Sequence, residues 1–459
     1  MTSSAQTIVV GAGISGLVCA YTLKKAGIDV QILEASPCPG GMIHSELRDG
    51  FLLELGPQSF SGTAALRSIC ADLGIADQLV HAPARAPRYV LIDAALKAVP
   101  LTPPAMLTSS LLSPTTKWRI ARDIFGTSTP PEDDESIASF VRRKFGVELL
   151  DRLVAPFVSG IYAGDPERLS LRSAFPQLHQ AEKSAGSVIR GMIRAAKSRK
   201  GPRERPTLLS FRDGNEALVR GLATKLGSQL RLGAEVLGIA SRDQAGKPGF
   251  DVTIRQASGD TLLTADHLVL ATSADVAGML LRDVNPAFEP VLTGIDYAPV
   301  AVVSLGYCRQ DVGDSLDGFG FLAPRSSGLR LLGCVWNSSL FPDRAPAGHV
   351  LLTSFIGGAT DPTAAALSEK ELADLVHREL SPLLQIRANP AFSHVQTYRR
   401  ALPQYNLGHA DRLRALEKLR LSVPGLFLVG NYLQDPAIGS CVDLGIATAE
   451  ALARTGQSA

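Results

Sequence analysis

The amino-acid sequence contains no apolar run of the roughly 20 residues that a membrane-spanning helix needs. The two best candidates are "HLVLATSADVAGMLL", which is interrupted by Asp275, and "PVAVVSLGY", which is too short. We therefore expect that the chain does not cross a membrane.

The sequence also lacks an excess of either charge and any closely paired cysteines. Its 46 basic and 44 acidic side chains leave a net charge of +2, so nucleic acid is not expected as a partner. The six cysteines form no C-x-x-C pair, which favours reduced thiols in a cytoplasmic protein and argues against structural zinc. The N-terminal "MTSSAQ" has no basic region typical of a signal peptide, so none is predicted.

Several catalytic motifs are missing as well. There is no H-E-x-x-H or close histidine pair for a metal, no P-loop G-x-x-x-x-G-K-[ST] and no G-x-S-x-G. These absences leave metal, NTPase and serine-hydrolase chemistry without support. The histidines nearest to the site expected below, His44 and His409, are interpreted as structural.

What the sequence does contain is a strand-helix-strand signal near its start, "TIVVGAGISGLVCAYTLKKAGIDVQILEAS", residues 7–36. Gly11 suits a tight turn, Gly13 lets the backbone approach a pyrophosphate, and Gly16 lets helix and strand pack closely. Glu34 ends the second strand, where a carboxylate accepts from ribose hydroxyls and repels a 2′-phosphate, so NADP is disfavoured. The stretch predicts a dinucleotide-binding unit.

The fingerprint continues into a phrase that distinguishes FAD from NAD. "EASPCPGG" carries Glu34, Ala35 and the pair Gly40-Gly41, and this spacing resembles the flavin-dependent amine oxidase superfamily. The only candidate for a second dinucleotide fingerprint, "GFGFLA" at 318–323, follows a polar segment and is rejected. FAD is the expected cofactor, and electrons should come from the substrate and leave to dioxygen or another acceptor.

Four further stretches resemble protoporphyrinogen oxidases and their coproporphyrinogen-oxidising relatives: "FVSGIYAGDPERLSLRSAFP", "GFGFLAPR" with "LLGCVWNSSLFPDRAP", "ALPQYNLGH", and "LVGNYLQDPAIGSCVDLG". The resemblance implies a set of cofactor-binding residues along nearly the whole chain. Gly11, Gly13, Ser15 and Gly16 are expected at the pyrophosphate, Glu34 at the ribose and Val236 at the adenine. Met42, Gly56, Pro57, Gln58 and Ser59 are expected on the flavin side of FAD, and Pro436, Ala437 and Ile438 at the isoalloxazine. The set also includes Ala12, Ile14, Ala35 and Gly41. Asp435 stands where the family usually has glycine.

The same resemblance implies a substrate site. Arg88 corresponds to an arginine that holds a porphyrin propionate, a role that suits a guanidinium because it forms charge-assisted pairs with carboxylates. Leu322, Val335 and Phe355 match the residues that sandwich the macrocycle. Gly160 and Gly164 either leave room for the macrocycle or for backbone contacts to it, or are merely turn residues. Taken singly, each of these apolar residues is also ordinary core, and Arg88 an ordinary surface arginine.

Changes of texture along the sequence predict an α/β protein with three parts. The first is a discontinuous, Rossmann-like FAD-binding domain made of residues 1–90, 205–285 and 420–459. The second is an inserted, mostly helical domain, residues 91–204, and the third an α+β substrate-binding domain, residues 286–419. Two segments, 101–114 and 194–205, could also place the helical domain against a membrane surface.

The expected reaction is oxidation of a porphyrinogen to a porphyrin with dioxygen as acceptor, in which the substrate loses six electrons in three steps. Coproporphyrinogen oxidation, an amine oxidase and a flavin-binding scaffold without turnover remain as alternatives. Whether the chain forms a homodimer is left open by the sequence.

Overall fold

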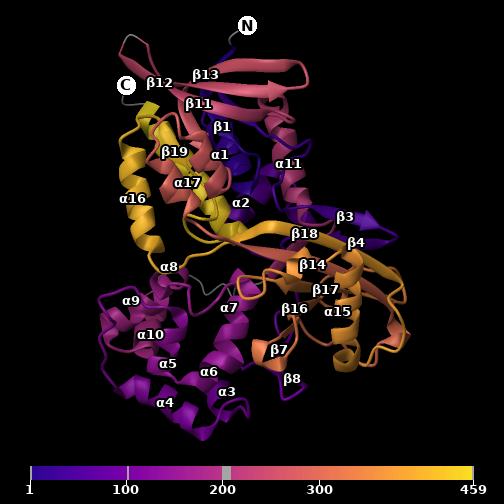
Figure 1. Cartoon of the computed structure of the whole chain (residues 1–459). Coiled ribbons are helices and arrows are strands. Elements are labelled where there is room, and N and C mark those ends of the chain that lie inside the picture. Colours follow the sequence, from indigo (N-terminus) through magenta and orange to yellow (C-terminus); the bar gives the residue numbers. More distant parts are fainter. Residues whose placement is uncertain (1–2, 101–102, 199–207, 245, 457–459) are drawn as a thin grey trace.

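The computed structural model describes residues 3–100, 103–198, 208–244 and 246–456. The residues outside these ranges include parts of both segments considered for membrane contact, 101–102 and 199–205. Figure 1 shows three parts: a sheet with helices at the top, a helical region at the lower left, and a second sheet at the lower right.

The first sheet combines strands from three distant parts of the chain. Its members are β1 (Ser3–Val10), β2 (Val30–Leu33), β10 (Leu230–Arg231), β11 (Glu235–Gln244), β12 (Lys247–Gln256), β13 (Gly259–Leu270) and β19 (Leu426–Leu428). The order is β10-β2-β1-β13-β12-β11, with β19 also paired to β13. β1 runs parallel to both β2 and β13, whereas β11, β12 and β13 form an antiparallel meander. The expected discontinuous α/β architecture is confirmed.

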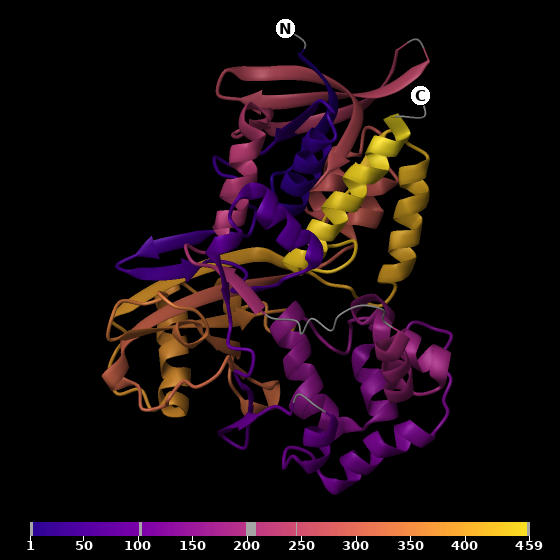
Figure 2. The ribbon, with the colours of Figure 1, turned by 180° about the vertical axis from the view of Figure 1, so that it is seen from behind.

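Both faces of this sheet are covered, because Ile8, Val9 and Val10 of β1 are all apolar and successive residues of a strand point to opposite sides. Val9 packs into a core formed with α1 (Ile14–Lys25), α2 (Ala64–Leu73), α11 (Glu216–Leu226) and α17 (Ile438–Gly456). Ile8 and Val10 face α12 (Ala274–Leu280), α13 (Phe288–Thr293) and α16 (His409–Leu421). Figure 2 shows α17, from the end of the chain, lying along α1. The two ends of the polypeptide therefore build one domain.

The second sheet has the order β18-β14-β17-β16-β15-β7-β8. Its strands are β7 (Arg88–Ile92), β8 (Ala95–Ala98), β14 (Tyr297–Cys308), β15 (Gly320–Leu322), β16 (Leu331–Trp336), β17 (His349–Gly357) and β18 (Phe392–Pro403). One face packs against α15 (Glu369–Leu384), which begins with a capping box between Ser368 and Glu371. Residues 88–98, which the sequence-based division splits between two other domains, thus form an edge of this sheet.

The helical region comprises α3 (Pro103–Thr108), α4 (Pro114–Phe125), α5 (Ile137–Lys144), α6 (Val147–Leu149), a π-helical turn (Leu150–Val154), α7 (Ala155–Tyr162), α8 (Leu171–Ala174), α9 (Pro176–Ala185) and α10 (Val188–Ser198). The remaining short strands are β3 (Ser45–Arg48), β4 (Phe51–Glu54), β5 (Phe60–Ser61), β6 (Leu79–His81) and β9 (Leu208–Phe211). β3 pairs with β4, and β5, β9 and β6 form a small separate sheet.

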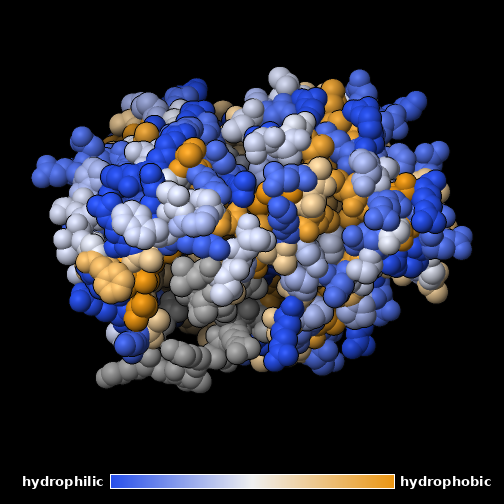
Figure 3. Space-filling view, turned by 90° about the horizontal axis from the view of Figure 1, so that it is seen from below, coloured by the Kyte–Doolittle hydropathy of each residue, from blue (hydrophilic) through white to orange (hydrophobic). Residues whose placement is uncertain are grey.

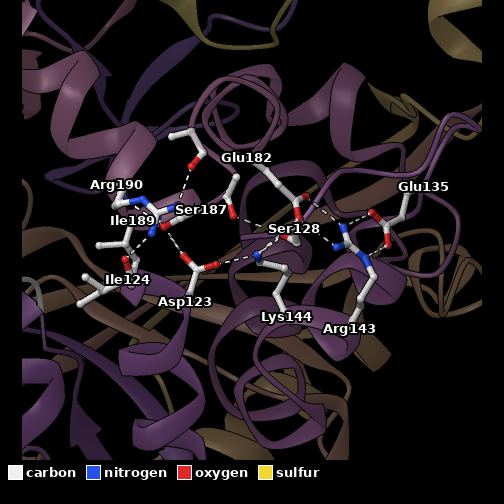
Figure 4. A network of polar contacts seen from close by, with 12 residues as sticks. Asp123, Ile124, Ser128, Glu135, Arg143, Lys144, Glu182, Ser187, Ile189 and Arg190 are labelled. Atoms are coloured by element: carbon white, nitrogen blue, oxygen red, sulfur yellow. Dashed lines mark hydrogen bonds and ion pairs between the residues drawn. The ribbon is translucent and has the colours of Figure 1, made fainter. Parts of the chain in front are cut away.

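A buried charge network fastens the helices α4, α5 and α9 (Figure 4). Lys144 Nζ lies 2.6 Å from Asp123 Oδ1 and 3.3 Å from Glu182 Oε1, and both carboxylates are almost inaccessible. Arg143 pairs with Glu182 and with Glu135 at 2.9 and 2.8 Å. Burial alone raises the pKa of a carboxyl group, yet hydrogen bonds from Arg143 and Ser128 lower the pKa of Glu182 to about 2. Every buried charge in this network has an opposite partner.

Candidate active site

The glycine loop between β1 and α1 shows a different steric requirement at each glycine. Gly11 has a φ of 101°, and a Cβ there would lie 2.8 Å from Ala271 O. A Cβ on Gly16 would lie 2.1 Å from Gly11 O, so only glycine fits. A Cβ on Gly13 would meet nothing within 4 Å. Open space over Gly13, beside the start of a helix, suits the close approach of a pyrophosphate.

The side chains of Ala12, Ile14 and Ser15 are buried. These three residues can therefore present only their backbone, including the N–H groups of the first turn of α1, to a phosphate. This is the mode of recognition that helix N-termini use.

Glu34 stands at the end of β2 beside this loop. Its Oε2 accepts the Ala12 N–H at 2.7 Å, and its Oε1 accepts the Ser36 N–H at 2.9 Å. The backbone of Glu34 also bonds the chain before β11, with Ala234 N–H donating to Glu34 O at 2.8 Å. Ala35, next to Glu34, is exposed, and Val236 follows two residues after Ala234 and is half-buried. The residues expected around ribose and adenine thus lie at one end of the parallel strands.

The segments expected at the flavin end form a strip that continues from the glycine loop. Gly40 N–H donates to Ala12 O at 2.8 Å, and a Cβ on Gly41 would lie 3.3 Å from Gly13 Cα. A Cβ on Gly56 would lie 2.0 Å from Met42 O. Gly40 and Gly41 thus contact residues 28 positions earlier, and Gly56 contacts a residue 14 positions earlier.

The start of α17 completes this end of the site. A Cβ on Gly445 would lie 2.7 Å from Ser15 O, so α17 packs directly on α1. In the turn before the helix, Asp435 Oδ1 accepts the Ala437 N–H at 2.7 Å. Asp435 is not among the residues with positive φ. The family's usual glycine is therefore not required by the backbone here, and the carboxylate closes the turn that presents Pro436, Ala437 and Ile438.

The residues expected to bind substrate share one face of the second sheet. Arg88 and Val335 both pair with Gly320, while Leu322 and Phe355 both pair with Gly333. Residues two apart on a strand point to the same side, so all four side chains lie on the face opposite α15. Leu322, Val335 and Phe355 are half-buried and Arg88 is exposed. The cation Arg88 therefore borders an apolar surface made of Leu322, Val335 and Phe355, which we call the substrate floor.

Helix α7 covers this floor. A Cβ on Gly160 would lie 2.4 Å from Leu322 Cδ2, so the two residues are in contact. A Cβ on Gly164 would instead meet Leu169 Cδ1 at 2.5 Å and Gln404 Oε1 at 2.9 Å, which makes Gly164 a packing residue of the turn after α7. Phe355 and Met42 pack on the same small cluster, which also contains Ala163. The expected cofactor strip and the expected substrate face therefore meet.

Two residues of α7 were not singled out from the sequence. Phe157 and Ile161 are 45% and 44% exposed although they are large and apolar, and they flank Gly160 on one side of the helix. Their spacing of four in "FVSGIY" is the signal that places them on one helical face. They extend the apolar surface beside Leu322.

His409 and Tyr405 support the loop that precedes α17. His409 Nε2 lies 3.0 Å from Tyr432 O, and its ring lies 4.9 Å from that of Tyr405. Burial lowers the pKa of His409 to about 4, so the imidazole is neutral near pH 7. The geometry supports a structural role.

The comparisons with known proteins agree with this arrangement. The model of the family "Flavin containing amine oxidoreductase" matches residues 14–453. The chain therefore belongs to the flavin-containing amine oxidoreductase family, and it is an FAD-dependent oxidoreductase. The expectations of FAD, of the fold class and of the superfamily are confirmed.

Within that family the chain is similar to enzymes that act on porphyrinogens. The chloroplastic protoporphyrinogen oxidase of Oryza sativa subsp. japonica is 36% identical over 96% of this chain and 86% of its own. The coproporphyrinogen III oxidase of Bacillus subtilis (strain 168) is 30% identical over 95% and 96%. The resemblance to the protoporphyrinogen oxidases is thereby confirmed.

Two solved structures illustrate how far the fold extends. A crystal structure assigned to a protoporphyrinogen oxidase from Exiguobacterium sp. 255-15 has a TM-score of 0.80 and 25% identity, covering 99% of this chain and 100% of that one. A putrescine oxidase variant has a TM-score of 0.75 at 18% identity, with 99% and 100% coverage. The second likeness concerns the fold alone.

Proposed function

We propose that this chain oxidises a porphyrinogen to a porphyrin in haem biosynthesis, with protoporphyrinogen IX as the substrate and protoporphyrin IX as the product. The observation that carries the proposal is the shared face of Arg88, Val335, Leu322 and Phe355, next to the segment that carries Met42. A flat, apolar floor with a cation at its edge suits a wide macrocycle that bears carboxylates.

The reaction removes six electrons and six protons in three two-electron steps, and three dioxygen molecules become three hydrogen peroxide molecules. Bound FAD would supply the acceptor for a hydride from a methylene bridge and the route by which the electrons reach dioxygen. The pyrrole nitrogen lone pair activates that carbon, so no strong side-chain base is required, and pyrrole protons pass to water.

The chain's own residues position the substrate and exclude water from it. Arg88 holds a propionate, while Leu322, Val335 and Phe355 exclude water from the macrocycle. The N-terminus of α17, the positive end of the helix dipole, favours negative charge on a bound cofactor. The segment of Gly11, Gly13 and Glu34 holds the dinucleotide end.

A second candidate, coproporphyrinogen III oxidation to coproporphyrin III, is favoured by the relatives of that name in Bacillus subtilis and in Staphylococcus aureus (strain NCTC 8325 / PS 47). The deciding experiment offers both porphyrinogens separately to the purified flavoprotein and follows porphyrin fluorescence and peroxide. A higher kcat/KM for protoporphyrinogen supports the first proposal, and a higher value for coproporphyrinogen transfers it to the second. Anaerobic addition of either substrate should reduce the flavin and bleach its colour. A flavin that stays oxidised and yellow would indicate a flavin-binding scaffold without turnover.

We further propose that the helical region contacts a membrane surface. On α4, Trp118 is 60% exposed and Phe125 85% exposed, with Arg122 between them on the same side. The neighbouring α10 exposes Met192 and Ile193 next to its basic end. Figure 3, seen from the end that carries these helices, shows apolar side chains interspersed with hydrophilic ones. Among the described residues no helix is long and apolar enough to cross a bilayer.

Sedimentation with phosphatidylglycerol vesicles tests this contact. Binding should exceed binding to phosphatidylcholine vesicles and should decrease in the double variant Trp118→Ser/Phe125→Ser. Equal recovery of wild type and variant with both lipids would refute the proposal. Light scattering of the same preparation also determines whether the chain forms a homodimer.

A further inference from the structure

Asn337 connects the second sheet to the expected cofactor strip. It follows β16 directly and begins the short helix α14 (Asn337–Leu340), two residues after Val335. Its Nδ2 donates a hydrogen bond to Gln58 Oε1 at 2.7 Å, across 279 positions of sequence. Gln58 in turn donates from Nε2 to Glu54 O and to Gly56 O, both at 2.9 Å. One amide thus holds the side chain that shapes the turn at residues 56–59.

The packing of Asn337 within its own domain does not explain the presence of this amide. Asn337 is 2% exposed, and its Oδ1 has no hydrogen-bond partner among the residues that the structure describes. Nearby Leu340, Phe341 and Val335 belong to an apolar cluster. A leucine, which has the same number of side-chain heavy atoms and the same branching, would avoid the cost of a buried, half-satisfied polar group. Within the part of the chain that the structure describes, the one side-chain hydrogen bond that Asn337 forms leads to Gln58.

A second connection runs in parallel from the same segment of chain. Arg344, 1% exposed, donates from Nη2 to Ser210 Oγ at 2.7 Å and to Phe211 O at 3.0 Å. Ser210 Oγ donates to Asn215 Oδ1 at 2.8 Å, and Asn215 Nδ2 donates to Pro57 O at 2.8 Å. Asn337 therefore bonds the 56–59 turn directly, through Gln58. Arg344 is connected to the same turn through the side chains of Ser210 and Asn215.

We infer that Asn337 is a positioning residue that fixes the flavin-lining turn 56–59 relative to the substrate wall of β16. Val335 and Asn337 lie on the same short piece of chain, so the amide sets the distance between the substrate floor and the flavin. Arg344, through Ser210 and Asn215, prevents the turn from tilting about the Gln58 contact. The inference depends on the proposed placement of residues 56–59 at the flavin.

The test measures cofactor binding, which does not depend on which porphyrinogen is the substrate. Apoprotein of wild type and of Asn337→Leu is titrated with FAD while flavin fluorescence is followed, and the visible spectrum and midpoint potential of the bound flavin are recorded. Stranding Gln58 Oε1 should weaken FAD binding by roughly 5- to 50-fold. The absorption bands and the potential should shift as well.

Ser338→Ala provides the matched control. Ser338 is the next residue, and its hydroxyl accepts the Leu351 N–H at 2.8 Å, a bond that stays within the second sheet. This variant also loses one hydrogen bond, yet its FAD Kd should stay within about twofold of wild type. Equal FAD affinities and identical flavin spectra in Asn337→Leu and Ser338→Ala would overturn the inference.

Two further variants separate positioning from general loss of packing. If Asn337 acts through Gln58, the double variant Asn337→Leu/Gln58→Met should bind FAD no more weakly than Gln58→Met alone. In Asn337→Asp the new carboxyl group donates only when protonated, so its FAD affinity should improve relative to wild type between about pH 8 and about pH 6. Additive losses in the double variant, or a pH response equal to wild type, would count against the inference. A chain that fails to oxidise porphyrinogens would leave these readouts intact.

Discussion

The carboxylate of Glu34 accepts the backbone N–H of Ala12 over 2.7 Å, which joins the end of β2 to the glycine loop that follows β1. Contacts within the protein itself therefore hold the loop in its conformation. A loop that the protein positions in this way leaves little ordering for cofactor binding.

The three glycines of the loop predict two distinct mutant phenotypes. Gly13→Ala adds a methyl group where nothing lies within 4 Å, so the apoprotein should keep its stability while the FAD Kd rises about tenfold or more. Gly16→Ala forces a methyl group to within 2.1 Å of Gly11 O, so the free energy of unfolding should fall by about 1–3 kcal/mol. Urea unfolding of both apoproteins and FAD titration measure the two effects. The prediction is wrong if Gly13→Ala loses as much stability as Gly16→Ala.

Arg88 should act on substrate binding more than on turnover. Arg88→Ala removes a charge-assisted pair with a carboxylate, worth about 1.5–3 kcal/mol, so KM for the porphyrinogen should rise about 10- to 100-fold while kcat changes less. Arg85→Ala, an exposed arginine just before β7, is the control and should leave KM within about twofold. Steady-state kinetics from porphyrin fluorescence decide. Equal responses of the two variants would remove Arg88 from the substrate site.

The charge network of Figure 4 predicts a large cost for losing its central cation. Lys144→Met leaves Asp123 and Glu182 buried without this partner, so the free energy of unfolding should fall by about 3–5 kcal/mol. Arg142→Met, two residues earlier on α5, breaks an exposed pair with Glu167 and should cost at most about 1 kcal/mol. Urea unfolding monitored by circular dichroism measures both. Similar losses of unfolding free energy in the two variants would show that burial does not increase the contribution of the Lys144 ion pairs.

Much of the cofactor half of the site is predictable because its signals are local. Gly11, Gly13, Gly16 and Glu34 occupy a single strand-helix-strand unit, so their spacing is visible within residues 7–36. The burial of both faces of β1 follows from the apolar run Ile8, Val9 and Val10. Local sequence is sufficient wherever the backbone conformation itself makes the site.

The substrate half depends on pairings that no local pattern contains. Arg88 comes to lie beside Val335 because β7 pairs in parallel with β15, more than 200 residues further along the chain. Only the family resemblance joined these residues in advance, and the short strand pair formed by β7 and β8 was divided between two expected domains. The bond from Asn337 to Gln58 was not foreseen, since neither residue type signals a partner 279 positions away.

The buried carboxyl group of Glu54 predicts a pH dependence of stability. Burial raises its pKa to about 7, against the opposing effects of Ser45 and Arg344, from an ordinary value of 4.5. Between these values the folded state binds more protons than the unfolded chain, so stability falls as pH rises from about 4.5 to about 7.

Glu54→Gln should remove this particular loss, because an amide does not titrate. The free energy of unfolding of the variant minus that of wild type should be larger at about pH 8 than at about pH 5, by about 1–3 kcal/mol. Urea unfolding at the two pH values provides the measurement. An equal free-energy difference at the two pH values would show that Glu54 is ionised throughout this pH range.

The packing of α17 along α1 also determines when this protein can bind FAD. The glycine loop is synthesised before β19 and before the helix that faces the loop. A nascent chain that still lacks α17 therefore carries only part of the expected cofactor site. We expect FAD to bind only after α17 has been synthesised, so the flavin colour should develop only in chains that contain this helix.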